Sequence, residues 1–204
     1  MSDSPQTLPL IDHGNDPFDL FSTWMSEAEK TEPSDPNAMT LATVTPEGRP
    51  DARIVLLKGA DRGGFVFYTN KDSRKGQELA ERPSAALLFH WKSLKRQIRI
   101  EGRVEHTSPE EADAYFASRS RMSRIGAIAS LQSRPLPERS EFEDRIRDTE
   151  EIYKEGPIPR PANWSGYRVI PDRFEFWQDR PWRLHDRVIW VAGDGGWSAT
   201  RLYP

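Results

Sequence analysis

The sequence predicts a mainly β fold, an antiparallel barrel with helices packed on its outside. Three observations lead to this class. Short segments rich in β-branched and aromatic residues recur along the chain, and turn-forming strings such as PEGRP and DRGG join the early ones. The long helical segments come after five strands and before three more, so strands do not alternate with helices as in a doubly wound fold. Neither a G-x-G-x-x-G nor a Walker motif is present, which disfavours a Rossmann or P-loop site.

The chain begins with an expected arm and a helix. Residues 1–16 are polar and rich in Pro and Asp, which predicts a mobile arm, and residues 17–204 are expected to form one domain. Pro17 suits the first turn of a helix over residues 17–31. The apolar side chains of this segment recur at helical spacing: Phe18, Phe21, Trp24 and Met25. We interpret them as the face of a helix that packs on the core.

The predicted strands form two groups. Five come early, at residues 39–45, 52–58, 64–70, 84–91 and 97–106. Three return near the carboxyl end, at residues 166–178, 185–192 and 196–204. Their composition fits a pleated and half-buried surface.

Three further helices are predicted between these strands. Residues 73–82 form a short helix with Ser73 as its cap. Residues 108–120 begin with a serine cap, a proline and two acids in the first turn. A highly charged helix over residues 139–156 ends at its glycine, and the string PIPRPANW that follows is interpreted as a rigid connector.

The composition excludes several classes of protein. No stretch approaches about 18 apolar residues, so no membrane span is expected. The amino terminus lacks the basic and apolar regions of a signal peptide, and the chain has no cysteine for a disulfide or a metal site. The four histidines form no H-x-x-x-H or similar pair, so no metal is expected. These features fit a cytoplasmic protein.

The charge pattern favours small anionic ligands. The net charge is −3, which argues against a nucleic-acid binder. Arginines nevertheless gather at residues 96–103, 119–124 and 180–187. Local arginine clusters on a mildly acidic chain suggest phosphates as ligands, although solvated surface arginines and ion pairs would give the same pattern.

Two patterns of polar side chains stand out. Tyr115 and Arg119 are four residues apart and share a helix face, with Ser123 four further on, so the three could clamp a phosphate. If residues 182–187 are extended, their alternate side chains point to one face, and Trp177 is a candidate to reach the same region. That face would carry Arg183, His185 and Arg187. A packing tyrosine with solvated arginines, or a structural histidine between surface arginines, would explain the same spacings.

Two weaker patterns also indicate anions. Arg53 and Lys58 bracket four aliphatic residues, and their odd separation places them on opposite faces of a regular strand. Arg74 and Lys75 lie in the first turn of a helix, where cations oppose the helix dipole and therefore hint at a bound phosphate. The pattern around Gln132 and Ser133, in the string ASLQSRP, indicates no role for either residue.

Taken together, these segments resemble the pyridoxamine 5'-phosphate oxidase family. The resemblance is carried, in order, by RIVLLK, FYTN followed by SRKG, RQIRIEGRVE, YFASR with RIGA, LQS, FEFWQ and RLHDR. The whole ordered set is far more specific than any single string. It implies an FMN-binding split β-barrel that forms a homodimer with FMN at the subunit interface.

The resemblance also implies the residues of the site. FMN would be held by Arg53, Ile54, Val55, Leu56, Leu57, Lys58, Tyr68, Thr69, Arg74, Lys75, Gln97, Gln132, Ser133, Trp177 and Arg187. The substrate phosphate would meet Lys58, Tyr115, Arg119 and Ser123. The implied catalytic residues, which would line the substrate ring and its reacting carbon, are Arg183 and His185.

The implied activity is that of a pyridoxal 5'-phosphate synthase. Pyridoxamine or pyridoxine 5'-phosphate would give hydride from its 4'-carbon to the flavin, and O2 would reoxidise the flavin to yield hydrogen peroxide. The amine substrate would form an imine that water hydrolyses, releasing ammonia. A flavin reductase or a non-catalytic FMN-binding protein of the same barrel superfamily is the alternative, and it would lack the substrate residues. The short acidic arm and the large Trp182 before Arg183 depart from the family pattern.

Overall fold

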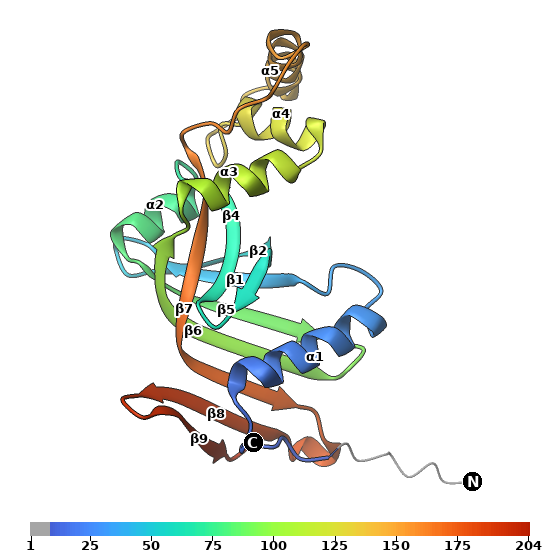
Figure 1. Cartoon of the computed structure of the whole chain (residues 1–204), viewed down its shortest axis with the longest axis vertical. Coiled ribbons are helices and arrows are strands. Elements are labelled where there is room, and N and C mark those ends of the chain that lie inside the picture. Colours follow the sequence, from blue (N-terminus) through green and yellow to red (C-terminus); the bar gives the residue numbers. More distant parts are fainter. Residues whose placement is uncertain (1–8) are drawn as a thin grey trace, which may run out of the picture.

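The structure is a computed structural model that describes residues 9–204. Nine strands form one curled sheet in the order β2-β1-β5-β6-β7-β4-β3, with β8 added beside β7 and β9 beside β8 (Figure 1). Their bounds are β1 Ala38–Val44, β2 Pro50–Leu56, β3 Gly59–Asp61, β4 Gly64–Asn70, β5 Ser84–Trp91, β6 Arg96–His106, β7 Trp164–Gln178, β8 Asp186–Gly193 and β9 Gly196–Leu202. Every pairing among these strands is antiparallel, as the sequence predicts.

Five α-helices and one 3₁₀ turn accompany the sheet in the described part of the chain. Their bounds are α1 Pro17–Thr31, α2 Arg74–Glu81, α3 Pro109–Ser118, α4 Arg121–Ala129, α5 Arg139–Ile152 and η1 Pro181–Arg183. Helices α3, α4 and α5 gather at one end of the molecule, and β8 and β9 lie at the opposite end (Figure 1). Among residues 9–204, no helix combines the length and the apolar character that a membrane crossing requires.

The main core lies between α1 and the curled sheet. Phe21 of α1 meets Phe65 and Phe89 with ring centroids 4.8 and 5.4 Å apart, and Trp24 meets Phe176 at 5.2 Å. These rings are buried, so the aromatic spacing of residues 17–31 is that of a core-facing helix, as predicted. A second, smaller core joins α3 and α4 to the start of β7 through Phe116, Ile125, Ile158 and Trp164. The two cores fix the helical end of the molecule against the long strand β7.

The helix predicted over residues 108–120 is α3, which ends at Ser118, and a second helix follows directly after the predicted range. Helix α3 begins with the predicted cap, since Ser108 accepts from the Glu111 N–H. It ends at Ser118, and Arg119 adopts an extended conformation (φ −73°, ψ 151°). Ser120 then accepts from the Ser123 N–H and caps α4, a helix that was not predicted from the sequence. A second capping serine so close to the first helix ends it and starts another in a new direction.

The other boundaries differ little from the predicted ones. Helix α2 begins after Ser73, whose side chain accepts from the Gly76 N–H. A Cβ at Gly76 would lie 2.2 Å from the Lys71 carbonyl oxygen, so only glycine lets the turn after β4 close against this helix. The charged helix α5 ends at Ile152 rather than at Gly156, and the short strand β3 was not predicted.

Part of the expected mobile arm is held against the sheet. Residues 1–8 lie outside the described residues. Ile11 is 4 % exposed, its N–H donates to Asp186 and its carbonyl accepts from Arg201. The Gln178 amide donates to the Pro9 carbonyl, and the Trp190 indole donates to the Asn15 carbonyl. Buried and part-buried hydrogen bonds from β7, β8 and β9 thus anchor residues 9–16.

Candidate functional site

A cavity of about 810 Å³ opens beside strands β2 and β4, α3 and the start of α4. It collects many of the residues that the sequence and the family resemblance indicate: Arg53, Ile54, Val55, Leu56, Lys58, Tyr68, Thr69, Lys75, Tyr115, Arg119, Ser123 and Gln132. Two lining residues were not predicted, Ser120 and Trp164. The cavity therefore joins two groups of cations, Arg53 with Lys75 and Lys58 with Arg119, around one space.

The predicted clamp of Tyr115, Arg119 and Ser123 does meet in this cavity, although for a different local reason. Arg119 lies between two helices rather than on one helix face with Tyr115. Ser123 lies in the first turn of α4, and its hydroxyl is 2.8 Å from that of Ser120. The Lys58 ammonium is 5.9 Å from the centre of the Tyr115 ring. Two cations, two serine hydroxyls and a helix start thus face one end of the cavity, a combination that suits an anion.

Arg119 carries a charge that the surrounding protein does not balance. Its guanidinium lies 5.0 Å from the Trp164 ring centre and 5.7 Å from that of Phe116. Its Nη1 atom is buried and has no hydrogen-bond partner among the described residues. Burial lowers the pKa of Arg119. Because a buried guanidinium nitrogen without a partner is costly, an anion that enters the cavity would gain strongly at this position.

Three aromatic rings stack on one another in the lining of the cavity and form one of its walls. The Tyr68 and Tyr115 rings stack with centroids 4.1 Å apart, and Tyr68 and Trp164 stack at 5.2 Å with planes 10° apart. Trp164 is the last residue of the string that was interpreted only as a connector, and nothing in that string indicates a wall of a site. Burial raises the pKa of Tyr68, so its hydroxyl stays neutral. The wall suits contact with a planar ring.

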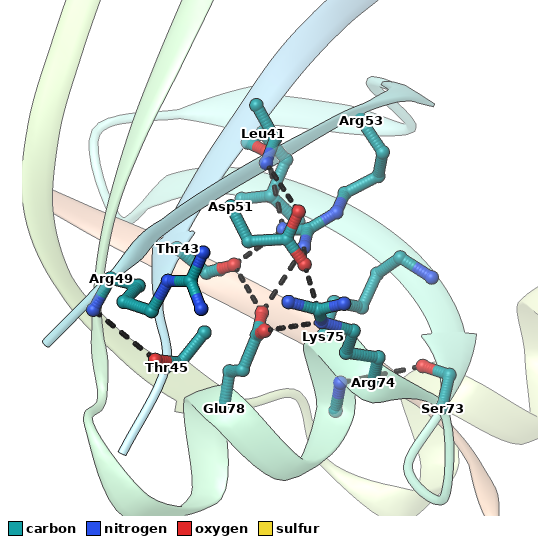
Figure 2. Close-up of polar contacts among 12 residues, drawn as sticks. Leu41, Thr43, Thr45, Arg49, Asp51, Arg53, Ser73, Arg74, Lys75 and Glu78 are labelled. Carbon is teal, nitrogen blue, oxygen red and sulfur yellow. Dashed lines mark hydrogen bonds and ion pairs between the residues drawn. The ribbon is translucent and has the colours of Figure 1, made fainter. Parts of the chain in front are cut away.

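Arg53 and Lys75 form the other cationic group. Lys75 is 9 % exposed, and its ammonium lies 3.5 Å from the Thr69 hydroxyl. Burial, and then the neighbouring charge of Arg53, lower the pKa of Lys75. Arg53 reaches into a set of polar groups that includes Glu78 (Figure 2). Gln132 lies next to this cationic group in the cavity lining, since its Oε1 lies 3.3 Å from the Thr69 hydroxyl.

The predicted separation of Arg53 and Lys58 is wrong. An odd spacing would place them on opposite faces of one strand, but β2 ends at Leu56 and Lys58 lies beyond it. Both residues line the same cavity because the alternation of side chains stops where the strand stops. Of the residues between them, Leu57 points into the core and is 7 % exposed, whereas Ile54 is 64 % exposed.

The predicted extended face of residues 182–187 is also wrong. Residues 181–183 form the turn η1, in which Trp182 and Arg183 adopt left-handed conformations with φ of 56° and 62°. Strand β8 begins only at Asp186, so the alternation needed to align Arg183, His185 and Arg187 does not exist. The Trp177 and His185 rings do lie together, with centroids 4.7 Å apart. Trp182 is 88 % exposed.

Several expected site residues lie away from the cavity within this chain. Trp177 pairs with Gln97 and Arg187 in the sheet, thirteen residues along β7 from Trp164 of the cavity wall. Thirteen strand residues span on the order of 40 Å, so these side chains cannot join the cavity of their own chain. Arg187 forms an ion pair with Glu175, 2.6 Å away. Outside the cavity lie Leu57, Arg74, Gln97, Ser133, Trp177, Arg183, His185 and Arg187.

Solved structures share this fold. PhzG from Burkholderia lata 383, in complex with tetrahydrophenazine-1-carboxylic acid, superposes with a TM-score of 0.89 at 29% identity, over 97% of this chain and 98% of that one. A pyridoxamine 5'-phosphate oxidase-related, FMN binding protein from Nostoc punctiforme PCC 73102 superposes with a TM-score of 0.75 at 19% identity, over 93% and 99% of the two chains. The curled antiparallel sheet with its lateral cavity therefore defines a split-barrel protein.

Sequence comparison assigns the family. Residues 25–153 match the profile of "Pyridoxamine 5'-phosphate oxidase", and residues 164–204 match that of "Pyridoxine 5'-phosphate oxidase C-terminal dimerisation region". The chain belongs to the pyridoxamine 5'-phosphate oxidase family, as the resemblance implies. Its relatives include a pyridoxine/pyridoxamine 5'-phosphate oxidase of Gluconobacter oxydans (strain 621H), 67% identical over 97% of this chain and 98% of that protein. A Rhodospirillum rubrum protein of the same name is 60% identical over 93% and 96%.

Proposed function

We propose that the protein is an FMN-dependent oxidase that converts pyridoxamine or pyridoxine 5'-phosphate to pyridoxal 5'-phosphate. O2 accepts the electrons, hydrogen peroxide is released, and the amine substrate also yields ammonia. The observation that carries the proposal is the Arg119 guanidinium, whose Nη1 atom is buried without a hydrogen-bond partner among the described residues, in the same cavity as a second cationic group at Arg53 and Lys75. Two separate anion sites in one cavity suit a phosphorylated cofactor beside a phosphorylated substrate. The names of the curated relatives support the same activity.

The residues of the cavity fit FMN. Lys75 is a buried ammonium whose contact with Thr69 is long, at 3.5 Å, so it retains hydrogen atoms to donate to a phosphate. The exposed apolar side chains of Ile54 and Leu56 offer an edge for the ring system. When bound, FMN supplies the acceptor for the hydride of the substrate carbon. The protein itself binds the flavin and the substrate, orients them and excludes water.

The substrate would be held by its phosphate. Arg119 and Lys58 supply charge, and the Ser123 and Tyr115 hydroxyls supply additional hydrogen bonds at the same end of the cavity. Fixing the phosphate there orients the substrate ring, which lowers the entropy cost of reaching the reactive geometry. A substrate without a phosphate would lose this anchor.

A homodimer would complete the site. The dimerisation profile covers residues 164–204, which contain the Trp177, Arg183 and His185 that the chain cannot bring to its own cavity. In a two-fold dimer, each chain can supply these residues to the cavity of its partner. His185 receives the Arg180 N–H on Nδ1, and this nitrogen also lies 3.1 Å from Asp179. Nε2 is therefore the atom that would orient the substrate or move a proton, while Arg183 would stabilise developing negative charge.

One assay tests the proposed function. The purified protein with FMN is incubated with each phosphorylated substrate and with unphosphorylated pyridoxamine, and aldehyde and peroxide are measured. We expect both products from at least one phosphorylated substrate and far less from pyridoxamine. A yellow protein that yields no product from either would contradict the oxidase and support a flavin-binding protein without this activity.

The buried Lys75 predicts how FMN affinity depends on pH. Its pKa lies below the ordinary value of 10.5, so its positive charge is present below that lowered pKa and is lost as the pH rises through it. The FMN phosphate is already a dianion above about pH 7, since its second pKa is about 6. We therefore expect FMN affinity in the wild type to fall as the pH rises through the lowered pKa of Lys75, before the ordinary lysine value of 10.5 is reached, and K75R to reduce this loss because arginine stays charged. Quenching of flavin fluorescence measures both profiles, and identical profiles would contradict the role of Lys75.

A further inference from the structure

Two arginines and two carboxylates form a compact group below the Arg53 side of the cavity (Figure 2). We name it the Glu78 cluster, made of Thr43, Asp51, Arg53, Arg74 and Glu78. Glu78 Oε2 accepts from the Thr43 hydroxyl at 2.6 Å and from Arg53 Nη2 at 3.1 Å, and its Oε1 accepts from Arg74 Nε at 3.1 Å. Asp51 bridges the same two arginines, at 2.7 Å from Arg53 and 2.8 Å from Arg74. The cluster ties β1, β2 and α2 together.

The two acids of the cluster differ in burial. The Glu78 side chain is 3 % exposed, whereas that of Asp51 is 24 % exposed. Arg53 and Arg74 together lower the pKa of Asp51 against the effect of its burial. A carboxylate as buried as Glu78 persists only where its oxygens are paired, and here both are. Neither the spacing of the sequence nor the family resemblance indicates a role for Glu78.

On the basis of the proposed function, we propose that Glu78 is a positioning residue for the phosphate end of the flavin site. It would act through Arg53 and Arg74 and would not touch the flavin. Arg53 Nη1 is held by the Leu41 carbonyl and the Thr43 hydroxyl, and Nη2 is held by the two acids. The guanidinium plane is therefore fixed before FMN arrives, and Arg53 lines the cavity together with Lys75. A fixed donor set binds more tightly than one that must be ordered on binding.

The charges of the cluster explain why an acid belongs there. Arg53, Arg74 and Lys75 are three cations from adjacent elements, and Arg53 already lowers the pKa of Lys75. Glu78 and Asp51 between the arginines offset their mutual repulsion. If Glu78 instead acted only as a negative charge near the phosphate, removing that charge would tighten FMN binding. The sign of the change therefore separates positioning from simple repulsion.

The test is the E78Q variant, which keeps the size of the side chain but leaves one acceptor oxygen where there were two. Affinities of the apo protein for FMN and for riboflavin, which lacks the phosphate, are measured by quenching of flavin fluorescence. We expect the FMN affinity to fall about 5- to 20-fold, since one charge-assisted hydrogen bond to an arginine is lost, while the riboflavin affinity changes less than about twofold. The preference for FMN over riboflavin thus falls, which a general loosening of the fold would not produce.

A matched control and a second variant accompany the test. Glu81 lies on the same helix and is exposed, so E81Q removes the same charge outside the cluster and should leave both affinities unchanged. If E78Q does not fold, T43V removes the hydroxyl shared by Glu78 and Arg53 and should lower the same preference about two- to threefold.

The possible outcomes are distinct. An unchanged or increased preference for FMN in the folded E78Q variant, or in T43V where E78Q does not fold, overturns the positioning role alone. A wild-type protein that does not bind FMN overturns the proposed function as well.

Discussion

Replacing Arg119 with methionine is expected to raise the KM for pyridoxamine 5'-phosphate by about 100- to 1000-fold while FMN stays bound. The half-buried guanidinium lies against the Trp164 ring and has a buried, unpartnered Nη1, so its hydrogen bonds and charge are available to the substrate phosphate. Two charge-assisted hydrogen bonds of about 1.5–2 kcal/mol each, at the lower end of their usual range, would account for this change. Methionine retains apolar contact with the rings but carries no charge. Steady-state kinetics, together with a flavin absorbance spectrum of the variant, measure the two effects separately.

A neighbouring arginine provides the control for this change. Arg121 is exposed, donates to the Tyr153 carbonyl and does not line the cavity. The R121M variant should therefore keep the wild-type KM within about twofold. An R119M variant with an unchanged KM would contradict the phosphate clamp. If R119M instead loses FMN, the assignment of the two anion sites would be reversed.

Replacing Arg183 with alanine is expected to lower kcat by about 100- to 1000-fold, the usual effect of removing a group that stabilises developing charge. FMN should remain bound, because the cations expected at its phosphate, Arg53 and Lys75, lie elsewhere. Arg183 is exposed on η1, in the part of the chain that β7 carries away from the cavity. The expected defect therefore tests whether a second subunit supplies this residue.

Mixed dimers show which subunit supplies it. In a hybrid of one R119M chain and one R183A chain, a site shared between subunits combines the intact Arg119 of one chain with the intact Arg183 of the other. Random exchange would restore about a quarter of the wild-type activity at low substrate concentration. If both residues acted within one chain, every site would keep a defect and mixing would restore nothing. Differently tagged chains, isolated as hybrids, verify that exchange has occurred, and inactive hybrids would contradict the shared site.

The sequence by itself determined most elements of the fold, although helix α4 and the short strand β3 were not predicted. Strands β4 and β5 have the predicted bounds of residues 64–70 and 84–91, because periodicity and turn residues are local signals. The capping serines Ser73 and Ser108 also begin the helices they predict, since a cap acts within one turn. The family resemblance, carried by ordered strings, added the FMN-binding split barrel and favoured the phosphate clamp that spacing had left open.

Only the tertiary structure decided which side chains share a site. Trp164 becomes a cavity wall because it stacks on Tyr68, nearly a hundred positions earlier in the printed sequence. Glu78 acquires its partners from two strands and its own helix, and no local pattern marks such a meeting. Arg183 and His185 lie far from Arg119 because one long strand separates the two ends of the molecule. Local sequence specifies backbone conformation, whereas burial and charge pairing depend on segments that only folding brings together.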